Sequence, residues 1–147
     1  MPGAAVRTVL EIGAPPARVW DVLADLGGYG GWNPVIREAS GELRPGARLR
    51  LFFNPPGTRG TVFHPVLSIV EPARELRWAG RPGVPFVLES EHFFILEAAG
   101  EGRTRLVHDM AFTGLLAPLV VKLRGAMIRD SFEMMNRALK DRAEGCE

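Results

Sequence analysis

The chain has 147 residues, of which 46% are hydrophobic and 24% charged, and its formal net charge is +1. This length and balance are typical of one globular domain, so we expect a single domain over residues 1–147. The nearly neutral charge gives no support for nucleic-acid binding, and no segment approaches the roughly 18–20 apolar residues of a membrane span.

The N-terminus and the cysteine content favour a cytoplasmic location. The first residues, MPGAAVRTVLEIG, lack the long apolar run after a basic start that a secretory signal requires. The one cysteine, Cys146, excludes a disulfide framework within the chain and a cysteine-based zinc site. We therefore predict a cytoplasmic protein.

The spacing of apolar residues predicts the elements in chain order. Alternation over Ala5–Ile12 predicts a first strand. Two prolines at 15 and 16, followed by apolar residues at helical spacing and by a glycine pair, predict a short helix. Residues 35–112 then alternate with period two between turn sequences, which predicts five or six strands in consecutive antiparallel order. A long helical pattern covers residues 115 to about 142.

This order is typical of an α+β fold in which a curved antiparallel sheet of six or seven strands wraps around the C-terminal helix. The sheet is apolar on one face and the helix along one stripe, so each covers the other. The stripe on the helix comprises Leu116, Val120, Leu123, Met127, Ile128, Phe132, Met135 and Leu139.

The parity of each strand predicts which side chains face inward. An unpaired carboxylate is expensive to bury, so the charge-poor set of each strand should face the helix. Asp109, Glu91 and His64 are then predicted to be solvated, and the facing of strand 60–70 stays open because both of its faces carry apolar residues. The inward set comprises Leu49, Leu51, Phe53, Leu76, Trp78, Phe86, Leu88, Ser90, His92, Phe94, Leu96, Leu106, His108, Met110 and Phe112.

Two histidines of that inward set are predicted to form a pair. If the hairpin turns over residues 98–102, His92 lies directly opposite His108. The favoured interpretation is that each histidine is a satisfied polar group in the sheet or near its rim, while contact with a ligand and acid–base catalysis stay open. A metal site would need a third ligand, and the inward neighbours offer only Ser90, so we predict no metal.

Five stretches of the sequence carry a resemblance to a known family. The chain resembles the START-like (SRPBCC) superfamily, which has the helix-grip fold, and in particular its bacterial polyketide cyclase/dehydrase and lipid-transport-like branch. The resemblance implies two short helices between the first two strands. The stretches are PPARVWDVLADLGGYGGWNP, VEPARELRWAG, SEHFFILE, TRLVHDMAFTG and FEMMNRALKDRAE.

The resemblance also implies a cavity between the sheet and the C-terminal helix, usually for an apolar or aromatic ligand. The glycine-rich stretch 27–34 would form a flexible lip at its open end, with Tyr29 and Trp32 at the entrance. The predicted ligand-binding residues are Phe53, Trp78, Leu88, Ser90, His92, Phe94, His108, Met110, Leu123 and Met127.

Two functions from different classes remain open at this point. The favoured one is binding or carriage of a small hydrophobic or aromatic ligand, without catalysis. The alternative is a cofactor-independent polyketide cyclase or dehydratase that uses His92 and His108. Against it, inward charged residues are scarce, and Met110 stands where many relatives carry a carboxylate. No cofactor is predicted, the expected partner is the ligand itself, and both a monomer and a homodimer are compatible with the sequence.

Overall fold

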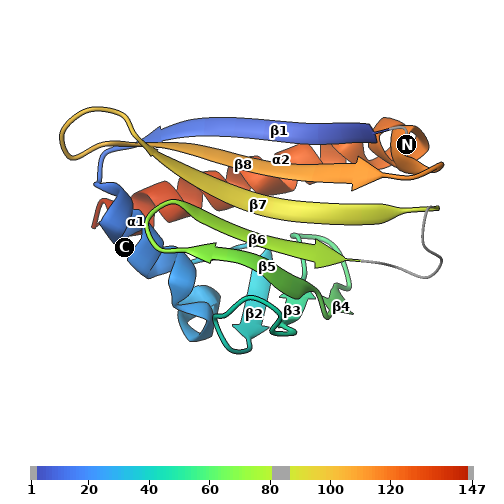
Figure 1. Cartoon of the computed structure of the whole chain (residues 1–147), viewed down its shortest axis with the longest axis horizontal. Helices are drawn as coiled ribbons and strands as arrows, with labels where there is room; N and C mark the ends of the chain where they lie inside the picture. Colours follow the sequence, from blue (N-terminus) through green and yellow to red (C-terminus); the bar gives the residue numbers. More distant parts are fainter. Residues whose placement is uncertain (1–2, 81–86, 146–147) are drawn as a thin grey trace.

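The computed structural model describes residues 3–80 and 87–145 (Figure 1). The order of the elements confirms the α+β fold, the two short helices after the first strand and the long C-terminal helix. These elements are β1 (Gly3–Ile12), α1 (Pro16–Ala24), the 3-10 helix η1 (Leu26–Gly31), β2 (Ile36–Ser40), β3 (Arg50–Phe53), β4 (Thr61–Phe63), β5 (Val66–Glu71), β6 (Glu75–Gly80), β7 (Glu89–Ala98), β8 (Thr104–Thr113) and α2 (Ala117–Ala143).

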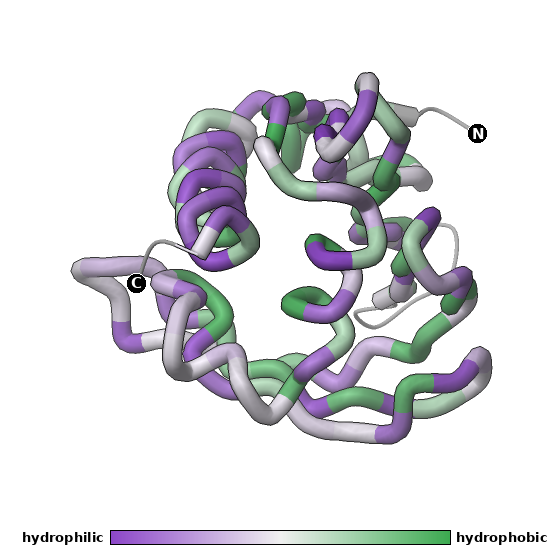
Figure 2. The backbone as a smooth tube through the Cα atoms, turned by 90° about the vertical axis from the view of Figure 1, so that its left-hand side faces the viewer, coloured by the Kyte–Doolittle hydropathy of each residue, from purple (hydrophilic) through white to green (hydrophobic). Residues whose placement is uncertain are grey.

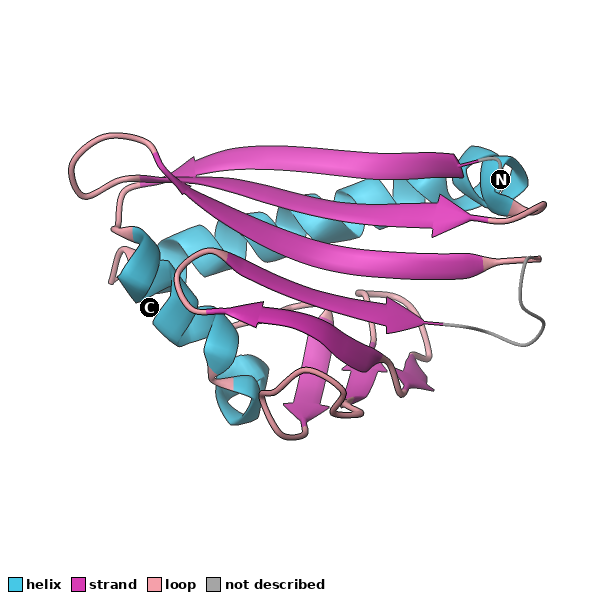
Figure 3. Cartoon of the chain, in the orientation of Figure 1, coloured by secondary structure: helices cyan, strands magenta, loops and turns pink. Residues whose placement is uncertain are grey.

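The strands form two antiparallel sheets (Figure 3). The larger sheet has the order β1-β8-β7-β6-β5 and the smaller has the order β2-β3-β4. An isolated bridge between Arg48 and Val66 connects them. The described residues form eight strands rather than six or seven, because segment 60–70 divides around His64 and Pro65 into β4 and β5, which belong to different sheets. Proline has no N–H to donate to a ladder, so a strand boundary at this position is expected.

Helix α2 packs against β1 and β8 and lies across the concave side of the larger sheet (Figures 1 and 2). The C-terminal half of its predicted apolar stripe is buried, namely Ile128, Phe132, Met135 and Leu139. The N-terminal half leaves Leu116 and Leu123 exposed. Tight packing therefore covers only part of the sheet. Among the described residues, no helix has both the length and the apolarity needed to cross a membrane.

The predicted inward parity agrees with burial in the larger sheet, with one correction on its outer face. Asp109 was expected to be solvated, yet its side chain is only 2% exposed. It lies on the central strand β8 directly opposite Arg7 of β1, whose Nε donates to its Oδ2 at 2.6 Å. A side chain on a central strand is covered by both neighbouring strands, and the arginine pairs with the carboxylate there. Glu91 is exposed as predicted and pairs with Arg77.

The hairpin between β7 and β8 is centred one residue later than the sequence suggested. Residues 99–103 form its loop, where Gly100 and Gly102 both have positive φ, a conformation that glycine adopts at little cost. As a result Met110 lies opposite His92, and Phe94 lies opposite His108. The prediction of a directly opposite histidine pair is wrong by two residues. Since two is the side-chain period of a strand, both histidines still share the inward face.

Candidate functional site

A cavity of about 660 Å³ lies between the concave sheet, the smaller sheet and the N-terminal half of α2. Its walls are mainly apolar, and a volume of this size is typical of sites for small molecules. The residues that line it are Ile36, Leu51, Phe53, Thr61, Val62, Phe63, His64, Pro65, Trp78, Gly80, Leu88, Ser90, His92, Met110, Phe112, Val120, Arg124, Met127, Ile128 and Phe132.

At one wall of this cavity the two histidines form part of a buried hydrogen-bond chain. His92 Nε2 lies 2.6 Å from His108 Nε2, and His108 Nδ1 lies 2.6 Å from Asn136 Oδ1. Asn136 Nδ2 donates to Thr8 Oγ1 at 2.8 Å, and that hydroxyl donates to the carbonyl of His108 at 2.7 Å. The chain connects β1, β7, β8 and α2. Residues diagonal to each other in a ladder can make such contacts when their side chains are long.

The donors and acceptors of this hydrogen-bond chain determine which ring nitrogen carries the proton in each histidine. Because the amide nitrogen of Asn136 donates to Thr8, its oxygen accepts from His108, which therefore carries its proton on Nδ1. His108 Nε2 is then the acceptor for a proton on His92 Nε2. The remaining nitrogen of His92, Nδ1, has no hydrogen-bond partner in the described part of the chain. It is not fully buried either, since it is not one of the buried side-chain atoms that lack a partner. We infer that this acceptor is accessible from the cavity.

Burial keeps both imidazoles neutral at pH 7. It lowers the pKa of His108 to about 3, against the opposing effect of the hydrogen bond with Asn136. Burial, and secondly the charge of neighbouring His108, lowers the pKa of His92 well below the ordinary value near 6.5. Stacked aromatic rings account for this desolvation, since Phe132 lies 3.9 Å from His108 and 4.8 Å from His92 between ring centroids. The inner wall therefore offers polar but uncharged groups.

Seven of the ten residues predicted to bind a ligand line the cavity. Ser90 is the second polar group among them, and its hydroxyl makes no hydrogen bond to any described residue. The seven are Phe53, Trp78, Leu88, Ser90, His92, Met110 and Met127.

The other three predicted lining residues lie elsewhere. Phe94 and His108 face inward but lie deeper, where Trp78 and His92 cover them. Leu123 is 69% exposed, because its side of α2 points to the surface rather than to the sheet. His64, predicted to be solvated, is exposed and also lines the cavity from the end of β4. Phe86 lies outside the described residues.

Neither aromatic residue of the glycine-rich stretch lies at the cavity, so the predicted entrance is wrong. Tyr29 is fully buried within η1, and its hydroxyl donates to the carbonyl of Leu23 at 2.7 Å. Burial, and secondly the negative charge of Asp25, raises the pKa of Tyr29. Trp32 packs edge-on against Tyr29 and lines a second, smaller pocket. The stretch is a 3-10 helix that anchors α1 rather than a lip over the cavity.

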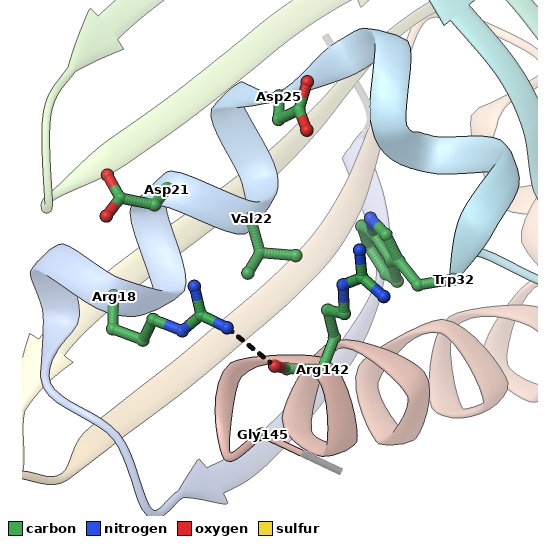
Figure 4. Close-up of a pocket in the computed structure, with 7 residues that line it drawn as sticks. All are labelled: Arg18, Asp21, Val22, Asp25, Trp32, Arg142 and Gly145. Carbon is green, nitrogen blue, oxygen red and sulfur yellow. Dashed lines mark hydrogen bonds between the residues drawn. The ribbon is translucent and has the colours of Figure 1, made fainter. Parts of the chain in front are cut away.

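That second pocket, of about 200 Å³, lies between α1 and the end of α2 (Figure 4). Arg18 donates from Nε to the carbonyl of Ala143 and from Nη2 to that of Arg142. The last carbonyls of a helix have no partner within it, so Arg18 caps α2. Arg18 thus has a structural use at this pocket. The lining residues are Arg18, Asp21, Val22, Asp25, Trp32, Arg142 and Gly145.

Sequence reasoning missed Asn136, Thr8 and Arg124. Asn136 could have been found, since it lies four residues after Phe132 on the apolar stripe of α2, where a polar side chain needs a buried partner. Thr8 is its partner from β1, which no local pattern indicates. Arg124 lines the outer part of the cavity from a stripe that otherwise looks apolar. Within the described ranges, no three His, Cys, Asp or Glu residues are grouped to hold a metal ion.

A long terminal helix gripped by antiparallel sheets over an apolar cavity defines the START-like class of proteins. The chain belongs to the polyketide cyclase/dehydrase and lipid transport family, whose sequence profile matches residues 3–144. No curated protein is detectably similar to it.

Solved structures share the fold at low sequence identity. The Zhui aromatase/cyclase from Streptomyces sp. R1128 superposes with a TM-score of 0.78 at 20% identity, covering 97% of this chain and 94% of that one. A START superfamily protein from Mycobacterium smegmatis gives 0.73 at 23% identity, covering 95% and 97%. Truncated norcoclaurine synthase from Thalictrum flavum gives 0.73 at 13% identity, covering 99% and 96%. Likeness at these identities establishes the fold and not the chemistry.

Proposed function

We propose that this protein, acting as one START-like domain over residues 1–147, binds or carries a small hydrophobic or aromatic ligand in the cavity. The observation that carries the proposal is a mainly apolar cavity of about 660 Å³, where the polar groups that the described residues present at the inner wall, His92 and Ser90, are neutral. Burial of apolar ligand surface supplies about 25 cal/mol per Å², while the few polar groups orient the ligand. The cytoplasmic location stays a prediction.

The size and lining of the cavity favour an aromatic ligand that carries a hydrogen-bond donor. Trp78 and Phe132 flank His92, and aromatic side chains favour offset or edge-on contact with a further ring. A neutral His92 with its proton on Nε2 presents Nδ1 as an acceptor. A phenol or alcohol is therefore favoured over a carbonyl, which has no proton to donate at this nitrogen.

The alternative function is a cofactor-independent cyclase or dehydratase of polyketide-like substrates. The hydrogen-bond chain from Thr8 through Asn136 and His108 to His92 supports it, because the chain fixes the orientation of a ring at the cavity wall. The lowered pKa of His92 counts against it, since a strong general base needs a pKa near the working pH. Binding is therefore the better-supported function.

A tryptophan placed in the cavity tests the proposal. Met110 faces the cavity opposite His92, so Met110→Trp should fill part of the volume and raise the Kd of a bound aromatic dye at least about ten-fold. Val9→Trp is the matched control, because Val9 is 46% exposed on the edge strand β1. Dye fluorescence gives the Kd and thermal melting shows that both variants fold. Equal affinity in the two folded variants would contradict binding in this cavity.

The native protein and a His92→Gln variant separate binding from catalysis. Native mass spectrometry of the purified protein should show a retained apolar ligand, and an aromatic panel should displace the dye. If His92 acts as a catalyst, His92→Gln should abolish turnover of a polyketide-like substrate while the Kd changes little. Loss of binding and turnover in equal measure would instead assign His92 a role in orienting the ligand.

A further inference from the structure

Arg124 is a cation at the outer part of the cavity that has no partner among the residues the structure describes. It lies on the second turn of α2, is exposed, and contributes to the cavity lining. No hydrogen bond or ion pair joins it to any residue in the described ranges. By contrast, the arginines at 7, 50, 77, 103 and 105 all pair with carboxylates. Its guanidinium is thus available to an anion inside or at the mouth of the cavity.

The surroundings of Arg124 are also free of negative charge along the helix. Residues 115–129 contain Lys122, Arg124 and Arg129 but neither Asp nor Glu. Across the cavity, the lining residues of β4 and the loop after it add Thr61, His64 and apolar side chains, and the lining residues that the structure describes include no carboxylate. A cation that lies next to apolar walls and forms no ion pair attracts an anion more strongly than one already neutralised.

The two ends of the cavity therefore differ in charge. Phe132, which stacks on His92, lies eight residues after Arg124 on the same helix. Because an α-helix rises about 1.5 Å per residue, Arg124 and Phe132 lie about 12 Å apart along the helix axis. We call the level of Phe132 the inner level of the cavity and that of Arg124 the outer level. The inner level presents the neutral acceptor of His92, and the outer level presents a guanidinium that matches the geometry of a carboxylate or phosphate.

We propose that the cavity selects amphipathic ligands, with an apolar body about 12 Å long, a hydroxyl at the inner end and an anionic carboxylate or phosphate held by Arg124. This inference rests on the proposed binding function and names its ligand class. The body occupies the apolar walls, the hydroxyl donates to His92, and the anion remains at the mouth, where water keeps it partly solvated. Keeping the charge at the mouth avoids the large cost of burying it.

The test compares three pyrene probes with the same four-carbon arm, ending in a carboxylate, a phosphate monoester or an uncharged amide. Fluorescence titration gives the Kd of each probe for the native protein, for Arg124→Gln and for Lys122→Gln. Lys122 is the matched control, because it is an exposed cation on the same helix that does not line the cavity. Thermal melting confirms that all three proteins fold.

We expect Arg124→Gln to weaken the anionic probes about 5- to 20-fold and the amide less than two-fold, with Lys122→Gln changing all three by less than two-fold. The probe with the larger loss identifies carboxylate or phosphate as the preferred anion. Equal losses for the anionic and amide probes, or equal effects of the two substitutions, would overturn the assignment of Arg124 while leaving cavity binding intact. Failure of every probe to bind the native protein would overturn both proposals.

Discussion

The contact between His108 and Asn136 should contribute measurably to folding, and a double-mutant cycle can isolate its contribution. Asn136→Leu leaves the Nδ1–H of His108 buried without an acceptor, which costs about 2 kcal/mol of unfolding free energy. His108→Phe keeps the ring stack on Phe132 and Phe94 but leaves Asn136 Oδ1 and His92 Nε2–H unpaired, at a cost of about 3 kcal/mol.

The double variant removes both partners at once, so only the His92 donor stays unpaired. With one unpaired donor left, its loss should be about 1.5 kcal/mol, which falls short of the summed single losses by about 3.5 kcal/mol. Urea unfolding followed by circular dichroism gives the three values. Met134→Leu, on an exposed position of the same helix, is the control and should change the unfolding free energy by less than about 0.5 kcal/mol. Single losses that add to within about 0.5 kcal/mol would refute the buried hydrogen bond.

Two further predictions concern pH and the glycine-rich stretch. Burial lowers the pKa of both His92 and His108, so below about pH 6.5 the unfolded state binds more protons, and stability falls as the pH decreases. The unfolding free energy should drop by about 4 kcal/mol between pH 7 and pH 5, and His92→Gln should remove about half of that drop; an unchanged slope would contradict neutral buried histidines. Tyr29→Phe should cost about 1 kcal/mol, because the carbonyl of Leu23 loses its donor, and should leave the Kd of the aromatic dye unchanged. A weaker Kd would place Tyr29 at the cavity after all.

The sequence was sufficient for the local elements because their signals are local. The apolar spacing in α2, the prolines before α1 and the period-two strands all depend on neighbours within a few residues. Strand parity likewise placed His92 and Ser90 on the inward face without any knowledge of the sheet. The cavity followed from the resemblance of five ordered stretches to the START-like superfamily and not from any one residue pattern.

The tertiary structure decided which of the inward and helical residues meet. The register of β7 and β8 depends on how glycines 100 and 102 turn the chain, and this shift placed Met110 opposite His92. Partners more than a hundred residues apart, such as Thr8 and Asn136, are joined only when β1 and α2 pack together. Tertiary packing also buried Tyr29 in η1 and left Arg124 beside the cavity without a partner among the described residues, because hydrogen bonds and ion pairs depend on distances in space that periodicity along the chain does not determine.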